Sequence, residues 1–463
     1  MATELKLAAN DAVEFGRAVA VSGDYVIVGA REPTMGFSDN GHAYIFAKNG
    51  SGWTQQTKLS PSVRQQGSDY FGTAVAIDGD YAIVGAPNSL SGEDGWAYVF
   101  HRQGSNWMEQ SVLVPGDPTP DGNFGRSVAI SGDWAIVGSS HGAYLFQRAG
   151  STWTQQTKVT GTGADFGQSV ALSGNYAVVG SFNSSSAYVF RRNGTTWQQQ
   201  TILTASDGTS DNHFGWSVSI SANYIIVGAF GATANSQAGA AYIFEGNGSV
   251  WVEQAKLEPG AVTQQGVKRF GQSVAISGGY AAVGDPSDDD IAPGSGAVYV
   301  YQRQGLAWPL LEKIIASDAA LFDAFGTWVA IDGSVAGGHA LVGTPDHQEG
   351  VAYLFSNFPA SFGQLIDPSR YSIYAKILFG LTGGGGGVVW LPGSGPVPVD
   401  PEPFKTWSAL SPTKRDLLVG LALSELANLI SDGRIRQEMR MAGVKLVKQA
   451  AGELRVSDVT ERF

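Results

Sequence analysis

A Phe-Gly pair recurs seven times along the chain, and this repeat restricts the possible folds more than any other feature. The pairs begin at Phe15, Phe71, Phe124, Phe166, Phe214, Phe270 and Phe325. Successive pairs lie 42 to 56 residues apart. Self-similarity at such a period is typical of solenoids and propellers, in which each unit buries its apolar face against its neighbours. The fold is therefore expected to consist of seven copies of one small unit.

Each unit has the sequence pattern of four short antiparallel strands. In the third unit, residues 127–138 form two apolar runs joined by Ser131-Gly132-Asp133, whose glycine supplies the positive φ of a tight hairpin. A third strand ends in Ala-Tyr-apolar-Phe or a close variant, and a fourth begins with a tryptophan in six units. Four strands per unit around a closed ring are the pattern of a β-propeller. We therefore predict an all-β fold, a seven-bladed β-propeller over residues 1–356.

The seventh unit lacks its own fourth strand, and the start of the chain offers a replacement. The third strand of that unit runs through Phe355 into Ser356 and then Pro359, with no tryptophan after it. Residues Thr3–Leu7 match Glu253–Leu257, which is the end of a fourth strand. We expect the N-terminal strand to complete blade 7 and close the ring, because closure protects strand edges that would otherwise be exposed.

Two short motifs carry a family resemblance. Phe-Gly before the first strand and Val84-Gly85-Ala86-Pro87 after the second resemble the FG-GAP repeats of integrin α-chain propellers and many bacterial proteins, over residues 1–356. In that family calcium occupies an Asp-x-Asp-x-Asp-Gly loop between strands one and two. The turns at this place, such as Ser22–Asp24 and Asp78–Asp80, are too short to supply the six to eight oxygen ligands of calcium. We therefore expect a calcium-independent protein without a cofactor.

Composition excludes several classes of partner and location. Asp and Glu number 41 against 29 Lys and Arg, for a net charge of −12, so phosphate backbones are repelled and nucleic acid is not expected as a partner. No cysteine is present to form a disulfide or a thiolate metal site. No apolar run reaches the roughly 18 residues of a membrane span. The first residues lack a secretory signal pattern. The chain is expected to be cytoplasmic as synthesised. Non-classical export, or carriage in a particle, are the ways in which it could leave the cell.

Candidate binding residues are sought on the face where the repeats vary. In a propeller, the loops between strands two and three and the segments before each Phe-Gly emerge on one face, and here both vary widely in length. Variable loops on a rigid scaffold are where recognition is usually built. Aromatic and acidic residues that break the repeat pattern stand at these places. We predict ligand binding by Glu93, Asp94, Trp96, Trp216 and Trp328.

One acidic cluster is a candidate cation site. It consists of Asp285, Asp288, Asp289 and Asp290, and its spacing fits no known calcium loop. The alternative interpretation is a solvated acidic loop, which the sequence favours. We predict no metal site, and these four aspartates are the one candidate cation site.

The sequence pattern changes after the seventh repeat. Residues 357–403 are predicted to hold a short helix and a Gly/Pro-rich linker. Residues 404–463 are predicted to form a helical hairpin, because apolar residues recur there at helical spacing. Two helices cannot build a sizeable core alone, so we expect this tail to dock on a partner or on another copy of the chain.

These features favour a non-catalytic binding or adhesion module that recognises a protein or a glycan through its variable loops. An interaction subunit of a phage-tail-like or other large particle is one alternative. An enzyme on a propeller scaffold is another, but no nucleophile–base or acid–base constellation is evident in the sequence.

Overall fold

In the computed structural model the chain divides into two units, residues 1–358 and 359–463. In the first unit the structure describes residues 2–358 except 10, 32–40, 51, 64–69, 88–93, 119–121, 164, 209–211, 232–238, 260–268, 335–337, 346–349 and 357. In the second it describes a two-stranded antiparallel sheet of β29 (Val388–Leu391) and β30 (Gly395–Pro398). The helices predicted within 357–403 and 404–463 lie outside the described residues and stay predictions.

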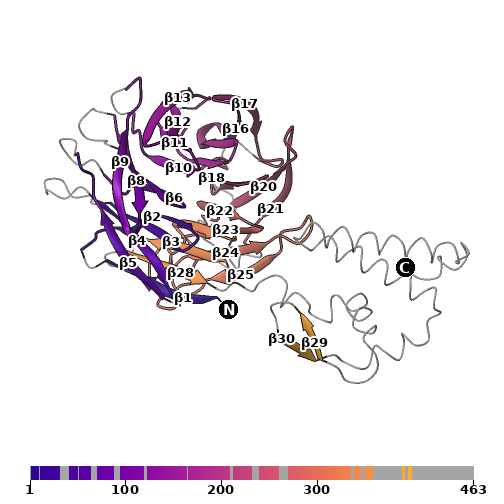
Figure 1. The fold of residues 1–463 in the computed structure, drawn as a ribbon. Helices are drawn as coiled ribbons and strands as arrows, with labels where there is room; N and C mark the ends of the chain where they lie inside the picture. Colours follow the sequence, from indigo (N-terminus) through magenta and orange to yellow (C-terminus); the bar gives the residue numbers. More distant parts are fainter. Residues whose placement is uncertain are drawn as a thin grey trace, which may run out of the picture. The chain divides into compact units, whose positions relative to one another are not determined.

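The first unit is an all-β, seven-bladed propeller, as the repeat predicts (Figure 1). Blade 1 consists of β2 (Phe15–Ser22), β3 (Tyr25–Ala30), β4 (His42–Asn49) and β5 (Gly52–Leu59). Blade 2 consists of β6 (Ala74–Asp78), β7 (Tyr81–Ala86), β8 (Trp96–Gln103) and β9 (Asn106–Leu113). Blade 3 consists of β10 (Ser127–Ser131), β11 (Trp134–Ser139), β12 (Gly142–Ala149) and β13 (Thr152–Val159). Blade 4 consists of β14 (Val170–Ser173), β15 (Tyr176–Ser181), β16 (Ser186–Asn193) and β17 (Thr196–Leu203). Blade 5 consists of β18 (Ser217–Ser221), β19 (Tyr224–Ala229), β20 (Ala240–Gly246) and β21 (Trp251–Leu257). Blade 6 consists of β22 (Ser273–Ser277), β23 (Tyr280–Asp285), β24 (Ala297–Gln302) and β25 (Leu310–Ile314). Blade 7 consists of β26 (Trp328–Asp332), β27 (His339–Thr344), β28 (Val351–Ser356) and β1 (Thr3–Leu7).

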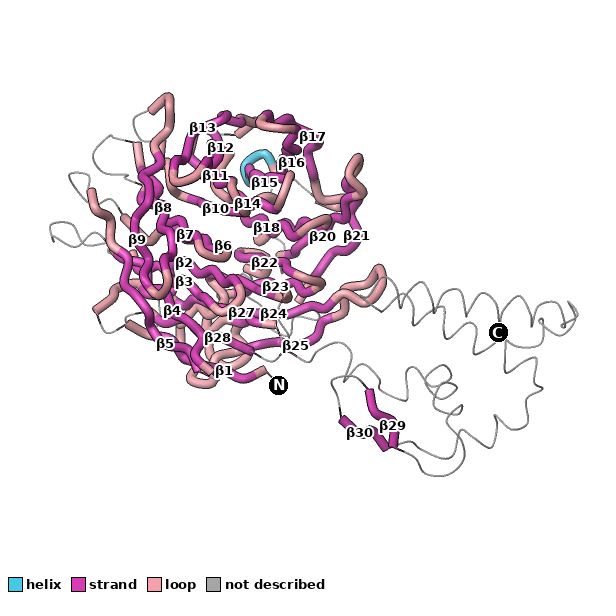
Figure 2. Tube along the Cα trace, viewed as in Figure 1, coloured by secondary structure: helices cyan, strands magenta, loops and turns pink. Residues whose placement is uncertain are grey.

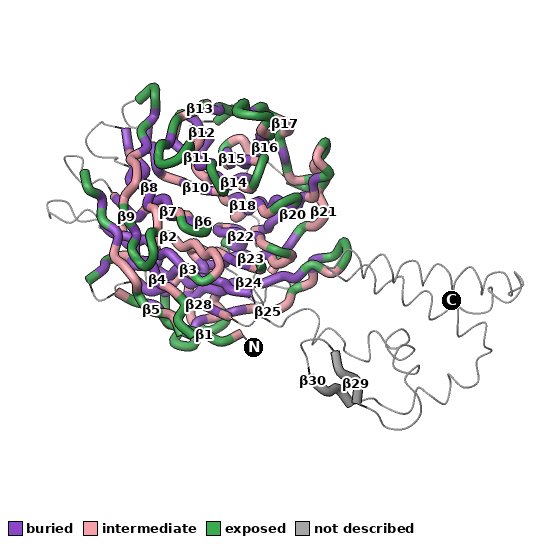
Figure 3. Tube along the Cα trace, in the orientation of Figure 1, coloured by how far each residue is buried: buried purple, intermediate pink, exposed green. Residues whose placement is uncertain are grey.

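The first strand of each blade lies innermost, and each contacts the first strand of the next blade around the ring. Within the described part of the chain, the helical content is one turn of 3₁₀ helix, η1 (Phe182–Ser184), between β15 and β16 (Figure 2). Buried residues fill the inner strands, and exposed residues follow the outer strands and the turns (Figure 3). None of the helical structure that is described has the length and apolar character to cross a membrane.

The N-terminal strand closes the ring, which confirms the sequence prediction. β1 pairs antiparallel with β28, from Thr3 opposite Ser356 to Leu7 opposite Ala352. Leu7 is buried in the cluster between blades 7 and 1, where Phe15 also lies. The two ends of the propeller therefore share one sheet and one core.

The phenylalanine of each Phe-Gly pair packs inside its own blade. In blade 1 the ring of Phe15 is fully buried and meets the rings of Tyr44 and Phe46 edge-on, at centroid distances of 5.5 and 6.1 Å. Edge-on packing is the favoured geometry for aromatic pairs. This contact joins the start of the first strand to the Ala-Tyr-apolar-Phe pattern of the third strand, so the two motifs recur together.

The glycines of the repeat form the seams between blades. A Cβ atom on Gly85, near the end of β7, would come closer than 3.0 Å to the carbonyl oxygen of Gly125, the Phe-Gly glycine of blade 3. The same close approach occurs at all seven seams: Gly29 on Gly72, Gly85 on Gly125, Gly138 on Gly167, Gly180 on Gly215, Gly228 on Gly271, Gly284 on Gly326, and Gly343 on Gly16. Glycine is needed here because two backbones meet with no room for a side chain.

The short turns between strands one and two also join neighbouring blades. The carboxylate of Asp78 accepts the amide N–H of Gly132 at 2.7 Å, and that of Asp332 accepts the amide of Gly23 at 2.7 Å. A serine hydroxyl replaces the carboxylate at other seams, as where Ser131 accepts the amide of Gly174 at 3.2 Å. The Ser/Asp-Gly pattern therefore serves contacts between blades.

A buried histidine lies at the seam where the ring closes. His339, on β27, has its Nδ1 2.8 Å from the hydroxyl oxygen of Ser356, and its ring meets Trp53 of blade 1 edge-on. Burial lowers the pKa of His339 below its ordinary value of about 6.5, and the nearby Lys48 lowers this pKa further. The folded protein therefore favours the neutral ring.

This histidine makes stability depend on pH. Below about pH 6.5 the unfolded chain takes up a proton at His339 more readily than the folded chain, so the free energy of unfolding falls from about pH 6.5 down to the folded pKa. We expect the loss of Tm between pH 8 and pH 5 to be smaller in His339→Asn than in the wild type. Replacement of the exposed His141 by Asn is the control. An equal loss in His339→Asn and the wild type would contradict this role.

Candidate binding face

The propeller has two faces of different character. The connections between strands two and three and between successive blades open on one side, which we call the loop face. The tight turns between strands one and two and between strands three and four open on the opposite side, the turn face. In blades 3 and 4 the connections between strands two and three are the short segments 140–141 and 182–185, as the sequence predicts.

The connectors between blades are held in place by a repeated ion pair. Lys158 of blade 3 lies 2.7 Å from Asp117 on the connector that leads into that blade, and its ammonium lies over the ring of Tyr144. The hydrogen bond from Lys158 lowers the pKa of Asp117. The same arrangement recurs in blades 1, 5 and 7 as Lys58 with Asp11, Lys256 with Asp207, and Lys6 with Asp318. The connectors that lead into blades 1, 5 and 7 are thus tied to their blades in the same way as the connector that leads into blade 3.

Three of the predicted ligand-binding residues, Glu93, Asp94 and Trp96, belong to blade 2. Glu93 lies outside the described residues. Asp94 is buried, and its carboxylate accepts the amide N–H of Phe124 at 3.1 Å, which ties the loop of blade 2 to the next blade. Trp96, the first residue of β8, is half-buried and packs against the core between blades 1 and 2. The structure thus gives Asp94 and Trp96 contacts within the propeller.

Trp328 lies at the seam between blades 7 and 1. It takes the place of a serine such as Ser127, whose hydroxyl donates to the Gly167 carbonyl of the next blade at 2.8 Å. The guanidinium of Arg17 lies 5.3 Å from the Trp328 ring centroid, in a cation–π contact. The indole N–H of Trp328 is buried without a hydrogen-bond partner among the described residues. Trp328 therefore joins two blades.

Trp216 belongs to a group of four aromatic side chains, which we call the aromatic cluster: Phe182, His213, Trp216 and Phe230. The Trp216 ring lies 4.6 Å from the Phe182 ring and 4.5 Å from the Phe230 ring between centroids. His213 lies 5.6 and 5.4 Å from the same two phenylalanines. All four are half-buried and come from the loop-face ends of blades 4 and 5.

Two members of the aromatic cluster occupy the same position in neighbouring repeats. Phe182 and Phe230 each follow the second strand directly, where other repeats have Arg31, Ser140 or a proline. His213 has a φ of +53°, and its Nδ1 is buried without a partner among the described residues. Sequence reasoning found Trp216 alone. A comparison of the residue after strand two across the repeats could have found both phenylalanines.

The aspartates of the acidic cluster form hydrogen bonds and ion pairs within the propeller, most of them in blade 6. The buried carboxylate of Asp288 accepts a hydrogen bond from Tyr299 at 2.9 Å and lies 2.8 Å from the ammonium of Lys313. Burial and the charge of Asp288 raise the pKa of Tyr299. Asp290 lies 2.5 Å from the same Lys313, and Asp285 accepts the backbone amide of Arg269. Lys313 thus supplies the positive charge at this place, and no group of side chains in the described part of the chain is arranged to hold a metal.

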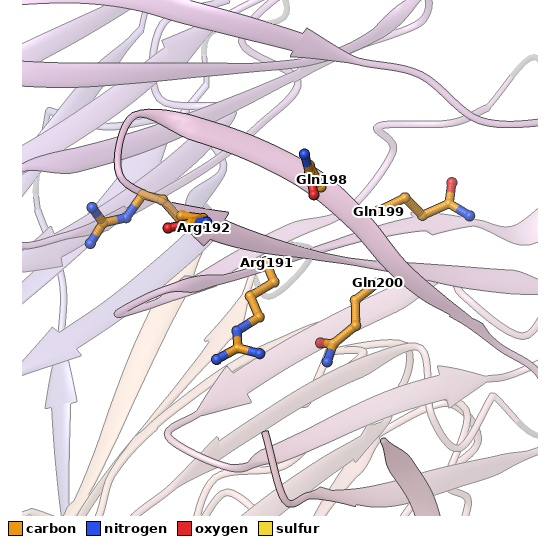
Figure 4. A pocket seen from close by; sticks show the side chains of 6 residues that line it. Arg191, Arg192, Gln198, Gln199 and Gln200 are labelled. Carbon is orange, nitrogen blue, oxygen red and sulfur yellow. The ribbon is translucent and has the colours of Figure 1, made fainter. Parts of the chain in front are cut away.

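A polar hollow of about 420 Å³ lies at the outer edge of blade 4. Arg191 and Gln200 point to the same side of the sheet and Arg192 to the other (Figure 4). Arg191 donates to the carbonyl of Gly248 at 2.8 Å, and Gln200 accepts the indole N–H of Trp251 at 3.1 Å. These lining groups therefore join blade 4 to blade 5.

The repeats match a known family along most of the propeller. The FG-GAP repeat model matches residues 3–46, 53–100, 107–151, 153–190, 197–244, 251–301 and 308–355. The chain belongs to the FG-GAP repeat family. No curated protein matches it by sequence.

Solved structures match the FG-GAP propeller at low identity. U3-55K is 12% identical, with a TM-score of 0.51, over 76% of this chain and 98% of that chain. A putative 6-phosphogluconolactonase from Bacteroides uniformis is 12% identical, with a TM-score of 0.46, over 65% and 85% of the two chains. The WD40 domain of Toxoplasma gondii coronin is 9% identical, with a TM-score of 0.49, over 78% and 87%. At these identities the likeness concerns the fold alone.

Proposed function

We propose that this FG-GAP propeller is a non-catalytic binding module whose loop face takes a protein or glycan ligand, with the aromatic cluster at the contact. The observation that carries the proposal is the half-exposed Trp216 between Phe182 and Phe230. At the position of Trp216 the other repeats have smaller or polar residues: Arg17, Thr73, Arg126, Gln168, Gln272 and Thr327. The propeller itself therefore does not need a tryptophan there.

The repeated tryptophans of the fourth strands serve a different purpose. The indole N–H of Trp107 donates to the side-chain oxygen of Gln56 in the preceding blade at 3.0 Å, and Trp153 donates to Gln110 in the same way. These tryptophans join blades. The aromatic cluster instead offers half-exposed rings on the loop face of blades 4 and 5. Rigid aromatic side chains of this kind contribute much of the binding energy in protein interfaces and small-ligand sites.

Two Ser–His hydrogen bonds bear on the alternative of an enzyme. His42 lies 2.9 Å from Ser60, and His339 lies 2.8 Å from Ser356. Both histidines are buried, and the His339 ring packs against Trp53 at a blade seam. A catalytic pair needs a substrate beside the nucleophile, so these pairs favour a structural role.

The proposal is tested by probing glycan and peptide arrays with the purified protein and with Trp216→Gln. Glutamine stands at the same position in blades 4 and 6, so this change should leave the fold and the Tm intact. We expect the hits of the wild type to weaken at least about tenfold in Trp216→Gln, which corresponds to about 1.4 kcal/mol. Gln272→Ala, at the same position of blade 6, is the control and should bind as the wild type does. Unchanged binding by Trp216→Gln would refute the role of the aromatic cluster.

A further inference from the structure

Three polar side chains follow one another along the inner rim of the loop face, and we call them the donor arc: Arg126, Gln168 and Trp216. Each comes directly after a Phe-Gly pair, at the start of the first strand of blades 3, 4 and 5. These first strands, β10, β14 and β18, contact one another in that order (Figure 2). All three side chains are half-buried.

Hydrogen bonds at the blade seams hold the members of the donor arc next to one another. The hydroxyl of Ser127 donates to the carbonyl of Gly167 at 2.8 Å, and the hydroxyl of Ser169 donates to the carbonyl of Gly215 at 3.1 Å. Each of these four residues is adjacent in sequence to a member of the donor arc. The three side chains therefore start from neighbouring places on the rim.

The guanidinium of Arg126 has no carboxylate within ion-pair distance in the described part of the chain. Its Nη1 donates to the hydroxyl of Ser140 at 3.2 Å. The acidic group whose charge acts on Arg126 is the buried Asp165, whose oxygens accept the amide of Asn183 at 3.0 Å and the hydroxyl of Ser181 at 3.4 Å. Burial lowers the pKa of Arg126, although the charge of Asp165 raises it. The guanidinium has thus lost water without gaining a paired anion, so a bound carboxylate would be favourable.

The other two members of the donor arc also have free donors. Neither the side-chain amide of Gln168 nor the indole N–H of Trp216 makes a hydrogen bond to the residues that the structure describes. The indole N–H of Trp328 is buried, whereas that of Trp216 is not. A guanidinium and an indole N–H can only donate, and a carboxylate can only accept. The donor arc therefore matches a ligand rich in oxygen acceptors.

Blades 3 and 4 have a charge of opposite sign to that of the chain. From Phe124 to Leu203 the sequence contains five Lys or Arg and two Asp, a net charge of +3, whereas the chain has a net charge of −12. Blade 1 also has an arginine after its Phe-Gly pair, but Arg17 lies 3.7 Å from the carboxylate of Glu14. An anion is therefore attracted to the part of the rim that holds Arg126.

We propose that the ligand of the loop face is a saccharide that carries a carboxylate, a uronic or sialic acid unit, and that Arg126 binds this carboxylate. The inference rests on the proposed function and names the ligand class of the same face. A guanidinium presents two parallel N–H donors to the two oxygens of a carboxylate. A pyranose ring also has an apolar C–H face for the ring of Trp216 and hydroxyls for the amide of Gln168. An acidic peptide supplies the carboxylate without this combination.

The first test changes the ligand and leaves the protein intact. The glycan array is probed before and after its carboxylates are coupled to methylamine with a carbodiimide, which turns each carboxylate into a neutral amide. We expect the hits of the wild type to be saccharides with a uronic or sialic acid, and amidation to weaken them at least tenfold. Hits that survive amidation unchanged, or that consist only of neutral saccharides, sulfated saccharides or peptides, would overturn the proposal.

The second test removes the charge of Arg126. Glutamine stands at the equivalent position in blades 4 and 6, so Arg126→Gln should keep the Tm of the wild type. We expect it to bind the carboxylate saccharides at least tenfold more weakly. Its remaining binding should also fall less as salt rises from 50 to 500 mM, because the ion pair is gone. Equal binding by Arg126→Gln and the wild type would overturn the proposal.

Arg191→Gln is the matched control for general attraction by blades 3 and 4. It removes an exposed charge at the outer edge of blade 4, and glutamine stands at the equivalent position in blades 3 and 6. Arg191→Gln should bind the carboxylate saccharides as the wild type does. A loss equal to that of Arg126→Gln would show that net charge alone attracts the ligand, and would overturn the proposal.

Failure of this inference and failure of the proposed function give different results. If Trp216→Gln loses the hits while Arg126→Gln keeps them, the proposed function holds and this inference is overturned. If amidation and Arg126→Gln remove the hits while Trp216→Gln keeps them, the role of the aromatic cluster fails and the carboxylate contact of Arg126 stands.

Discussion

Deletion of residues 2–8 should open the propeller and cause a large loss of stability. The deletion removes β1, so β28 (Val351–Ser356) becomes an unpaired edge strand. It also removes Leu7 from the buried cluster between blades 7 and 1. Loss of one buried leucine costs about 2–5 kcal/mol, and the lost pairing adds to this. We expect a Tm lower by many degrees in calorimetry and association through the new edge in light scattering.

Two point variants on the same strand give a matched control for the deletion. Leu7 is buried, whereas Leu5 is 36% exposed. Leu7→Ser should therefore lower the Tm by several degrees, and Leu5→Ser should change it little. A deletion variant that stays monomeric with the Tm of the wild type would show that β1 does not hold the ring closed.

Replacement of Gly85 by alanine should be as damaging as the deletion. The added Cβ would overlap the carbonyl oxygen of Gly125 in the next blade. Gly85 lies in β7 and Gly125 in the turn that leads into β10, so both clashing groups are held by backbone. Relief requires the blades to separate, so we expect a loss above about 4 kcal/mol, in the range of the most severe single substitutions. Thermal melts and the soluble yield measure this effect.

Gly52→Ala is the matched control for the seam glycine. A Cβ on Gly52 would meet only the carbonyl oxygen of Asn49, at 3.8 Å, which is ordinary contact. Its Tm should stay within a few degrees of the wild type. Equal Tm values for Gly85→Ala and Gly52→Ala would contradict the seam packing.

The repeat made the fold predictable. Seven copies of the same pattern gave independent evidence for one blade, and the missing seventh strand pointed to Thr3–Leu7 as its replacement. The seams could not be predicted in the same way. The contact between Gly85 and Gly125 joins different repeats across space, and no spacing within one repeat reveals it. The helices predicted after residue 356 lie outside the described residues.

The candidate site was predictable only in part. Trp216 stood out because it breaks the repeat, and the structure places it in the aromatic cluster on the loop face. Trp96 and Trp328 break the repeat as well, but they pack at blade seams. Whether an unusual aromatic residue faces a ligand or a neighbouring blade depends on tertiary contacts, which the pattern of a single strand does not contain.

The most direct test of the binding account blocks one face of the propeller at a time. The chain has no cysteine, so a single introduced cysteine can carry a bulky polyethylene glycol maleimide at one place. Asn183→Cys lies beside Phe182 on the loop face, and Thr195→Cys lies in a turn of the same blade on the opposite face; both positions are exposed. The conjugates are compared on the glycan and peptide arrays that define the wild-type hits. The account predicts that the conjugate at position 183 loses these hits and the conjugate at position 195 keeps them. Loss of the hits at 195 with retention at 183 would contradict it.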